Sequence, residues 1–114
     1  MSLERVLRLL EDFGFSKVDA EVYVYLAKTG PQKGKDLNDG LKMPKNQLYL
    51  ALESLQTKGV VARSSERPAF FSALAFEELL NLYVKLNVEK AKIIKENKEE
   101  LLASWRDMTT INNS

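Results

Sequence analysis

The chain has 114 residues, of which 45% are hydrophobic and 29% are charged, and its formal net charge is +1. This length predicts one domain with one core. The sequence contains no cysteine and no histidine, which excludes disulfides, thiolate chemistry, most zinc sites and the most common general base. We therefore expect no enzyme, and no catalytic residue, metal or cofactor. The lack of cysteine suits a reducing, cytoplasmic location, and no run approaches 18 apolar residues, so we expect no membrane partner.

Two helices are predicted at the start of the chain. Apolar residues at helical spacing favour an amphipathic helix over residues 3–13. Ser16, with an acid three residues later, is typical of a helix N-cap, and a second helix is predicted from there to the stop at Gly30. Its Tyr23 and Tyr25 are possible stacking platforms for bases. Because no basic residues are interleaved with them, we interpret them as core.

A short helix, a tight turn and a longer helix follow. Residues 32–41 suffice for about two helical turns, and residues 40–43 form the connection. Pro44 opens the longer helix and Gly59 closes it. One stripe of this helix is apolar and predicted to be buried: Leu48, Ala51, Leu52 and Leu55. The order is that of a helix-turn-helix, although an αα-hairpin has the same pattern.

The opposite face of the helix over residues 44–58 carries candidate DNA-reading side chains. These are Lys45, Asn46, Gln47 and Tyr49. Amides can make paired hydrogen bonds to adenine, and lysine can donate to guanine. Residues 28–67 hold eight basic and four acidic side chains, a local net charge of +4 around this helix. Ordinary solvated lysines would give the same charge count.

After Gly59 the pattern changes to the alternation of strands. Residues 60–63 and 69–73 predict two short strands joined by a turn. A hairpin directly after a recognition helix is a wing, and Arg63 or Arg67 would lie against a phosphate or in a minor groove. An isolated hairpin is marginally stable, so we expect one of the two phenylalanines of the second strand to anchor it on the helices.

The last element is a long helix. Residues 75–107 contain neither Gly nor Pro. Steps of four and three residues predict a heptad seam at Leu79, Tyr83, Leu86, Lys90, Ile93, Asn97 and Leu101. Polar residues such as Lys90 and Asn97 in a seam fix register and strand number, which indicates a homodimer; a solvated single helix is the alternative. We thus expect a winged helix-turn-helix domain over 1–74, a dimerisation helix over 75–107 and a disordered tail over 108–114, mostly α with a small β-hairpin.

The order of these elements and three stretches of sequence resemble the N-terminal DNA-binding domain of the TrmB family of archaeal transcriptional regulators. The stretches are FGFSKVDAEVYVYLAKTGP (13–31), MPKNQLYLALESLQTKGVV (43–61) and ERPAFFSAL (66–74). They contain the Ala-x-Val-Tyr-x-x-Leu helix, the Gly-Pro stop, a recognition helix built on Pro-x-x-x-hydrophobic-Tyr, and an Arg-Pro wing. The resemblance implies a homodimeric winged-helix repressor or activator that binds double-stranded DNA at the nucleoid.

Carried over position by position, the resemblance implies two groups of contacts. The major-groove residues would be Lys45, Asn46 and Gln47, and the backbone contacts would come from Lys33, Lys35 and Tyr49. Three places depart from the family pattern: Glu53 in the recognition helix, Ala69-Phe70 in the wing and Gly40-Leu41 in the turn. Larger family members carry a sugar-sensing domain. This chain ends too soon to hold one, so we expect no small-molecule effector.

The departures also support a second interpretation. A winged helix can serve as a protein-interaction module or a chromatin-architectural protein, because fold does not fix function. The near-neutral total charge, Glu53 and Phe70 favour that interpretation. Leu50, on the exposed side of the recognition helix, suits either a protein partner or a thymine methyl group. DNA binding remains the leading prediction, with double-stranded DNA and a second copy of the chain as partners.

Overall fold

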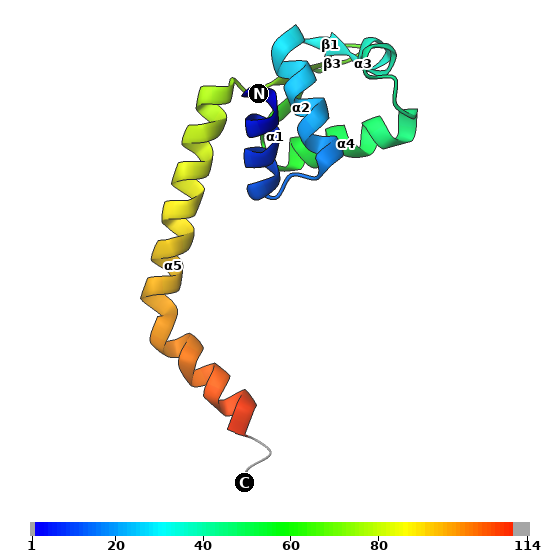
Figure 1. Cartoon of the computed structure of the whole chain (residues 1–114). Helices are drawn as coiled ribbons and strands as arrows, with labels where there is room; N and C mark the ends of the chain where they lie inside the picture. Colours follow the sequence, from blue (N-terminus) through cyan, green and yellow to red (C-terminus); the bar gives the residue numbers. More distant parts are fainter. Residues whose placement is uncertain (1, 111–114) are drawn as a thin grey trace. The chain divides into compact units, whose positions relative to one another are not determined.

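The structure is a computed structural model that describes residues 2–110. Figure 1 shows the elements in chain order. They are α1 (Ser2–Asp12), α2 (Lys17–Thr29), β1 (Gln32–Lys33), α3 (Gly34–Leu41), α4 (Lys45–Thr57), β2 (Val61–Arg63), β3 (Phe70–Ala73) and α5 (Phe76–Thr110). The chain divides into two units after Leu79. The first is a winged helix-turn-helix and the second is the rest of α5, so the predicted fold class is confirmed.

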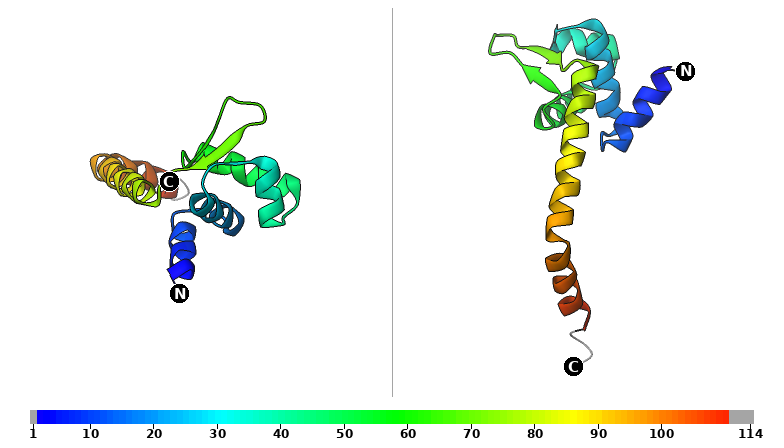
Figure 2. Two further views of the ribbon diagram at one scale, coloured as in Figure 1. Left: turned by 90° about the horizontal axis from the view of Figure 1, so that it is seen from above. Right: turned by 90° about the vertical axis from the view of Figure 1, so that its left-hand side faces the viewer.

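The wing contains three strands rather than the predicted two. Gln32 pairs with Phe71 and Lys33 with Phe70, so β1 lies antiparallel to β3, which also pairs with β2. The short helix was predicted to begin at residue 32 and begins instead at Gly34. The difference has a physical reason: β1 pairs with backbone groups that would be free at the edge of a two-stranded hairpin. The loop of the hairpin β2–β3 extends away from the helices of this unit (Figure 2).

Capping side chains and special backbone angles set the helix ends. The Ser16 hydroxyl accepts a hydrogen bond from the Asp19 N–H at 3.0 Å, which confirms the predicted N-cap of α2. Gly40 lies inside α3, not in the turn, and a Cβ at Gly40 would lie 2.0 Å from the Tyr25 hydroxyl oxygen. Glycine therefore allows α3 to approach α2 closely. The left-handed residue that ends α3 is Lys42, with φ of 54°.

The core of the first unit lies where the apolar stripes of its helices meet. The predicted stripe of α4 is buried at all four positions. Tyr23 is buried and its hydroxyl donates to the Leu74 carbonyl oxygen at 2.6 Å, which confirms its core assignment. Phe71, 4% exposed, is the phenylalanine that anchors the wing. Leu79 is also fully buried in this core, so the prediction that it belongs to a dimer seam is wrong.

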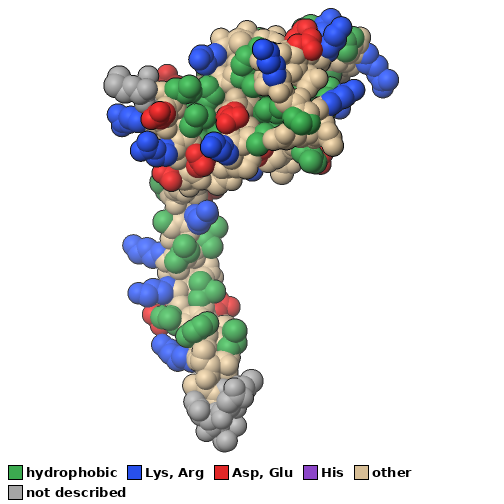
Figure 3. All heavy atoms as spheres, turned by 45° about the vertical axis from the view of Figure 1, so that its right-hand side comes forward, with side chains coloured by type: hydrophobic (Ala, Val, Ile, Leu, Met, Phe, Trp, Pro, Cys, Tyr) green, Lys and Arg blue, Asp and Glu red, His purple; other side chains and the backbone are tan. Residues whose placement is uncertain are grey.

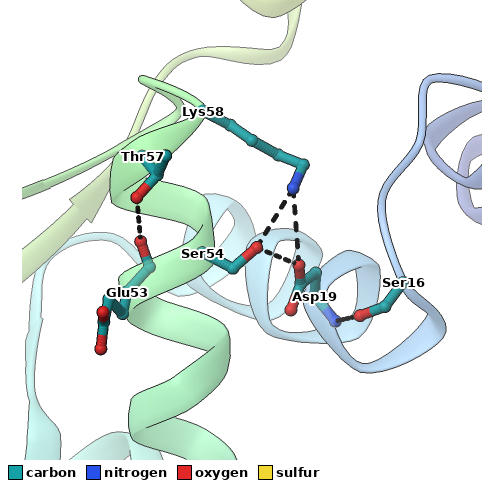
Figure 4. Close-up of polar contacts among 6 residues, drawn as sticks. All are labelled: Ser16, Asp19, Glu53, Ser54, Thr57 and Lys58. Carbon is teal, nitrogen blue, oxygen red and sulfur yellow. Dashed lines mark hydrogen bonds and ion pairs between the residues drawn. The ribbon is translucent and has the colours of Figure 1, made fainter.

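A polar cluster of Asp19, Ser54 and Lys58 joins α2 to the C-terminal part of α4. Figure 4 shows the Asp19 carboxylate accepting a hydrogen bond from the Ser54 hydroxyl at 2.6 Å. Lys58 lies 3.9 Å from the same oxygen of Asp19 and donates to Ser54 at 3.1 Å. Asp19 is only 7% exposed, yet it has partners from the helix that carries the candidate reading residues. The cluster therefore links α4 to α2 through partly buried hydrogen bonds.

Helix α5 is longer than predicted at its C-terminal end. It continues through Thr110, so residues 108–110 are helical rather than a disordered tail, and residues 111–114 of that predicted tail lie outside the described residues. Beyond Leu79, no described residue of α5 is buried. Figure 3 shows hydrophobic side chains exposed along this helix beside basic ones. None of the helices within residues 2–110 is both long and apolar enough to cross a membrane.

Candidate nucleic-acid interface

The predicted reading residues lie at the exposed start of α4. Lys45, Asn46 and Gln47 are exposed, whereas Leu48, directly after them, is fully buried. Pro44 precedes the helix with φ of −55°, and its carbonyl oxygen accepts the first helical hydrogen bond from the Leu48 N–H. The first turn of α4 therefore presents its donors and amides to solvent because the leucine stripe behind it is packed. What these side chains bind stays a prediction.

Tyr49, which was predicted to contact the DNA backbone, packs partly against other residues of the protein. It is 40% exposed, and its ring meets the Phe71 ring edge-on, with 6.3 Å between centroids and an interplanar angle of 76°. Its hydroxyl lies against Gly34, where an added Cβ would be 2.0 Å away. Tyr49 thus packs α4 against β3 and the start of α3, and only part of its side chain can reach a ligand.

An open groove of about 1110 Å³ lies between the start of α3, one side of α4 and the wing. It brings together five of the eight predicted DNA-binding residues: Lys33, Lys35, Tyr49, Arg63 and Arg67. Among the described residues, Glu66 is the one acid that lines it. Lys45, Asn46 and Gln47 do not line it. The structure therefore separates a cationic groove from the exposed amides at the start of α4.

Phe70 does not line this groove, but its ring contacts Lys33, which does. The ammonium of Lys33 lies 5.5 Å from the centroid of the Phe70 ring, within the range of a cation–π interaction. Pairing of β1 with β3 sets the two residues opposite each other. The apolar residue that departs from the family pattern in the wing therefore contacts a cation at the start of α3. The signal was absent from the local sequence because the two residues are far apart in the chain.

The hairpin itself is closed by Ser64. Its N–H donates to the Phe70 carbonyl oxygen, and its hydroxyl accepts from the Phe70 N–H, both at 2.8 Å. Arg63 and Arg67 remain exposed on either side of this closure. Ser64, Ser65 and Gln56 also line the groove and were not predicted. Only the tertiary arrangement of α4 and the wing brings them there.

Acidic clusters and tyrosines with shifted pKa values are the features of the described residues that bear on metal binding and proton transfer. Residues 2–110 contain no group of three or more acidic residues arranged to hold a metal ion. Burial raises the pKa of Tyr23 to about 12 and also raises the pKa of Tyr83. A tyrosine with a raised pKa keeps its proton at neutral pH, so neither shift supplies a base. The arrangement offers hydrogen-bond donors, amides and positive charge on one unit.

Comparisons with known proteins agree with this geometry. The family model of the sugar-specific transcriptional regulator TrmB matches residues 10–77. The HTH-type sugar sensing transcriptional regulator TrmBL1 of Pyrococcus furiosus is 36% identical over 58 residues, which are 51% of this chain and 17% of that protein. This chain thus spans only a small part of that relative's length.

Two solved structures share the fold. TrmBL2, described as an archaeal chromatin protein with a novel mode of DNA binding, has a TM-score of 0.81 at 22% identity, over 95% of this chain and 42% of its own. The ST1889 protein of Sulfolobus tokodaii has a TM-score of 0.64 at 21% identity, over 81% of this chain and 99% of its own. The family match covers more than half of the chain and confirms the resemblance seen in the sequence. The chain therefore belongs to the TrmB family of transcriptional regulators.

Proposed function

We propose that this chain is a sequence-specific regulator that binds double-stranded DNA as a homodimer. The observation that carries the proposal is the exposure of Lys45, Asn46 and Gln47 at the start of α4, on the same unit as the groove lined by four cations. A helix with polar side chains at its N-terminal end fits the major groove and can read base edges. The regulators of the TrmB family supply the context for this role.

The cationic groove would hold one strand of the DNA backbone. Lys33, Lys35, Arg63 and Arg67 line it, and phosphate contacts position a protein on DNA without reading sequence. Each phosphate that they neutralise releases counterions, which makes binding depend steeply on salt. Reading and positioning would therefore come from separate side chains. Such a protein is expected at the nucleoid.

Homodimerisation would use the exposed apolar stripe of α5. Without Leu79, the predicted seam still contains Leu86, 41% exposed, and Leu101, 55% exposed. The line of residues that contains them repeats every 11 residues, at steps of three, four and four, and not every seven. Its members, apolar apart from Lys90 and Asn97, are Tyr83, Leu86, Lys90, Ile94, Asn97, Leu101, Trp105 and Met108. An 11-residue repeat winds two helices with little or right-handed supercoil. On this pattern Ile94 takes the seam position that the heptad pattern gave to Ile93.

A second candidate is an architectural DNA-binding protein without sequence preference. The likeness to TrmBL2, described as a chromatin protein, supports it at the level of fold. The cationic groove would suffice for such binding, because backbone contacts carry no sequence information. The two candidates differ in whether the exposed amides of α4 discriminate between duplexes.

The test is a titration of the full chain with fluorescent duplexes at several salt concentrations. We expect binding to weaken linearly on a log–log plot of affinity against salt. Lys33→Ala and Arg63→Ala should weaken binding to every duplex and lower the slope by about one each. Asn46→Ala should instead remove preference among duplexes selected from a random library, at about 1–3 kcal/mol. Absence of duplex binding even at low salt would refute the proposal, and equal binding to all duplexes would favour the architectural role.

A further inference from the structure

The outermost line of α4 runs beyond the predicted reading residues. Positions 46, 50, 53 and 57 follow one another at helical steps of four and three residues, on the face opposite the buried stripe. All four are exposed: Asn46, Leu50, Glu53 and Thr57. From residue 46 to residue 53 the line covers about 10 Å of helix axis, the length of about three base-pair steps.

Leu50 lies at the middle of this line and is 68% exposed. An aliphatic side chain gains nothing from phosphate oxygens, because burying it beside charged groups offers no hydrogen bond. In the major groove, however, the C5 methyl group of thymine is an apolar feature that adenine, guanine and cytosine lack. A leucine flanked by Asn46 and Glu53 on the outward face is suited to that methyl group.

Glu53 carries a charge that DNA phosphates repel. No cation among the described residues forms an ion pair with it; the nearby Lys58 contacts Asp19 and Ser54 instead. In Figure 4 the Glu53 carboxylate points away from that cluster. Thr57 donates to the backbone carbonyl oxygen of Glu53, not to its carboxylate. In a major groove the carboxylate would therefore be a charged hydrogen-bond acceptor that has no ion-pair partner among the described residues of the protein.

A bare carboxylate in a major groove is stabilised where it meets an amino donor. Cytosine presents its N4 amino group there, and carboxylates are suited to accept from it. Opposite a base edge that offers only acceptors, the same carboxylate would be repelled by both the base and the phosphates. Glu53 would thus weaken binding to wrong sequences, which is discrimination by a repulsive contact.

We propose that Leu50 and Glu53 are specificity-determining residues, Leu50 contacting a thymine methyl group and Glu53 accepting a hydrogen bond from cytosine N4. The proposal rests on the proposed function and extends it from the start of α4 to its middle turns. The preferred site then contains a thymine and a cytosine within about three base-pair steps of the base that Asn46 reads.

The test begins with a duplex enriched by the full chain from a random library. Each thymine of that duplex is then replaced by uracil, which removes only the methyl group, and binding is measured by fluorescence anisotropy. We expect one replacement to weaken the wild-type complex about fourfold, as for loss of one buried methyl group. Leu50→Ala should bind the thymine and uracil duplexes equally. Thr57→Ala, on the same line but one turn beyond Glu53, is the matched control and should keep the wild-type response.

Glu53→Gln tests the second residue, because the amide keeps the shape and removes the charge. We expect that replacing one cytosine of the duplex weakens its binding to the wild type by about 5- to 150-fold. The same replacement should weaken binding to the variant by less than about threefold. The variant should also bind unrelated duplexes more tightly than the wild type does. Both positions are exposed, so the variants should melt within a few degrees of the wild type.

The outcomes separate this inference from the proposed function. If a duplex is enriched but no uracil replacement weakens binding, and Glu53→Gln selects the same sequence as the wild type, the inference is wrong and the regulator role stands. If no duplex is enriched and all are bound equally, the sequence-specific role fails and the inference fails with it.

Discussion

The winged unit and the remainder of α5 use apolar residues at helical spacing in opposite ways. In the winged unit the leucines are enclosed, and Leu10, Leu26 and Leu55 have no exposed surface. From residue 80 to residue 110 the same spacing leaves its large side chains in solvent: Val84, Leu86, Val88, Ile93, Ile94, Leu101, Leu102, Trp105 and Met108. A periodic apolar pattern therefore indicates a helix in both regions, but among the described residues only the winged unit encloses its own leucines.

This difference separates two kinds of stability. The winged unit has its own core, caps and a polar cluster between α2 and α4. An exposed apolar stripe of the length found on α5 is uncommon on monomeric proteins and marks interaction surfaces. Helical stability in proteins comes mainly from packing of such a face, so in the proposed dimer α5 would gain most of its stability from its partner.

The largest effect should come from the enclosed region. Leu55→Ala removes a fully buried side chain from the stripe of α4 and should lower the free energy of unfolding by about 2–5 kcal/mol. Urea denaturation followed by circular dichroism measures the loss. Leu50→Ala, on the same helix at 68% exposure, is the matched control and should change it by less than about 0.5 kcal/mol. Similar losses for both would contradict the assignment of the core.

The next effect should come from the exposed stripe. In the proposed dimer, Leu101→Glu introduces a charge at a seam position on each copy and loses two buried leucines, so association should weaken about 100-fold or more. Sedimentation equilibrium over a range of concentrations measures it. Ala103→Glu places the same charge on the opposite face of α5 and should leave association unchanged. A wild-type chain that is monomeric throughout, or a Leu101→Glu variant that associates normally, would contradict the dimer.

The sequence predicted the winged unit well because its signals are local. Ser16, Gly30 and Pro44 mark helix ends by their own backbone chemistry, and the leucines of α4 mark their face by spacing. The strand β1 was missed because two residues, Gln32 and Lys33, are too few to show a period. Their pairing with β3 depends on residues almost forty positions later.

The assignment of Leu79 was wrong for a related reason. Spacing shows which side of a helix is apolar but not what packs against it, and Leu79 fits both a seam and the end of a core. The same limit applies to the candidate site. Lys33 was predicted from a resemblance and Arg67 from the hairpin pattern, each by itself. The groove that they share, and the contact of Lys33 with the Phe70 ring, exist only in the folded unit.

A smaller effect should come from the polar cluster between α2 and α4. Asp19→Ala leaves the Ser54 hydroxyl and the half-buried Lys58 ammonium without their carboxylate partner. We expect a loss of about 1–3 kcal/mol in the free energy of unfolding. Glu21→Ala, an exposed acid on the same helix, is the control and should be nearly neutral. If both variants unfold alike, the cluster does not join the two helices energetically.

The smallest effect should come from the Tyr23 hydroxyl, and its sign depends on pH. Tyr23→Phe keeps the ring, which meets Phe15 edge-on at 6.4 Å, but removes the hydrogen bond to the Leu74 carbonyl oxygen. At neutral pH this should cost about 1 kcal/mol. Burial raises the pKa of Tyr23 to about 12 from an ordinary value of 10.0, so the folded state holds this proton more tightly than the unfolded state.

The stabilisation from that proton is therefore complete below pH 10 and is lost as pH rises toward 12. Urea denaturation of the two proteins at several pH values should show the wild type more stable at pH 8, with its advantage shrinking between pH 10 and pH 12. The two proteins differ only in this hydroxyl, so the difference between their curves reports on it alone. Parallel curves would contradict the raised pKa of Tyr23, because they would mean that its hydroxyl titrates alike in the folded protein and in the unfolded chain.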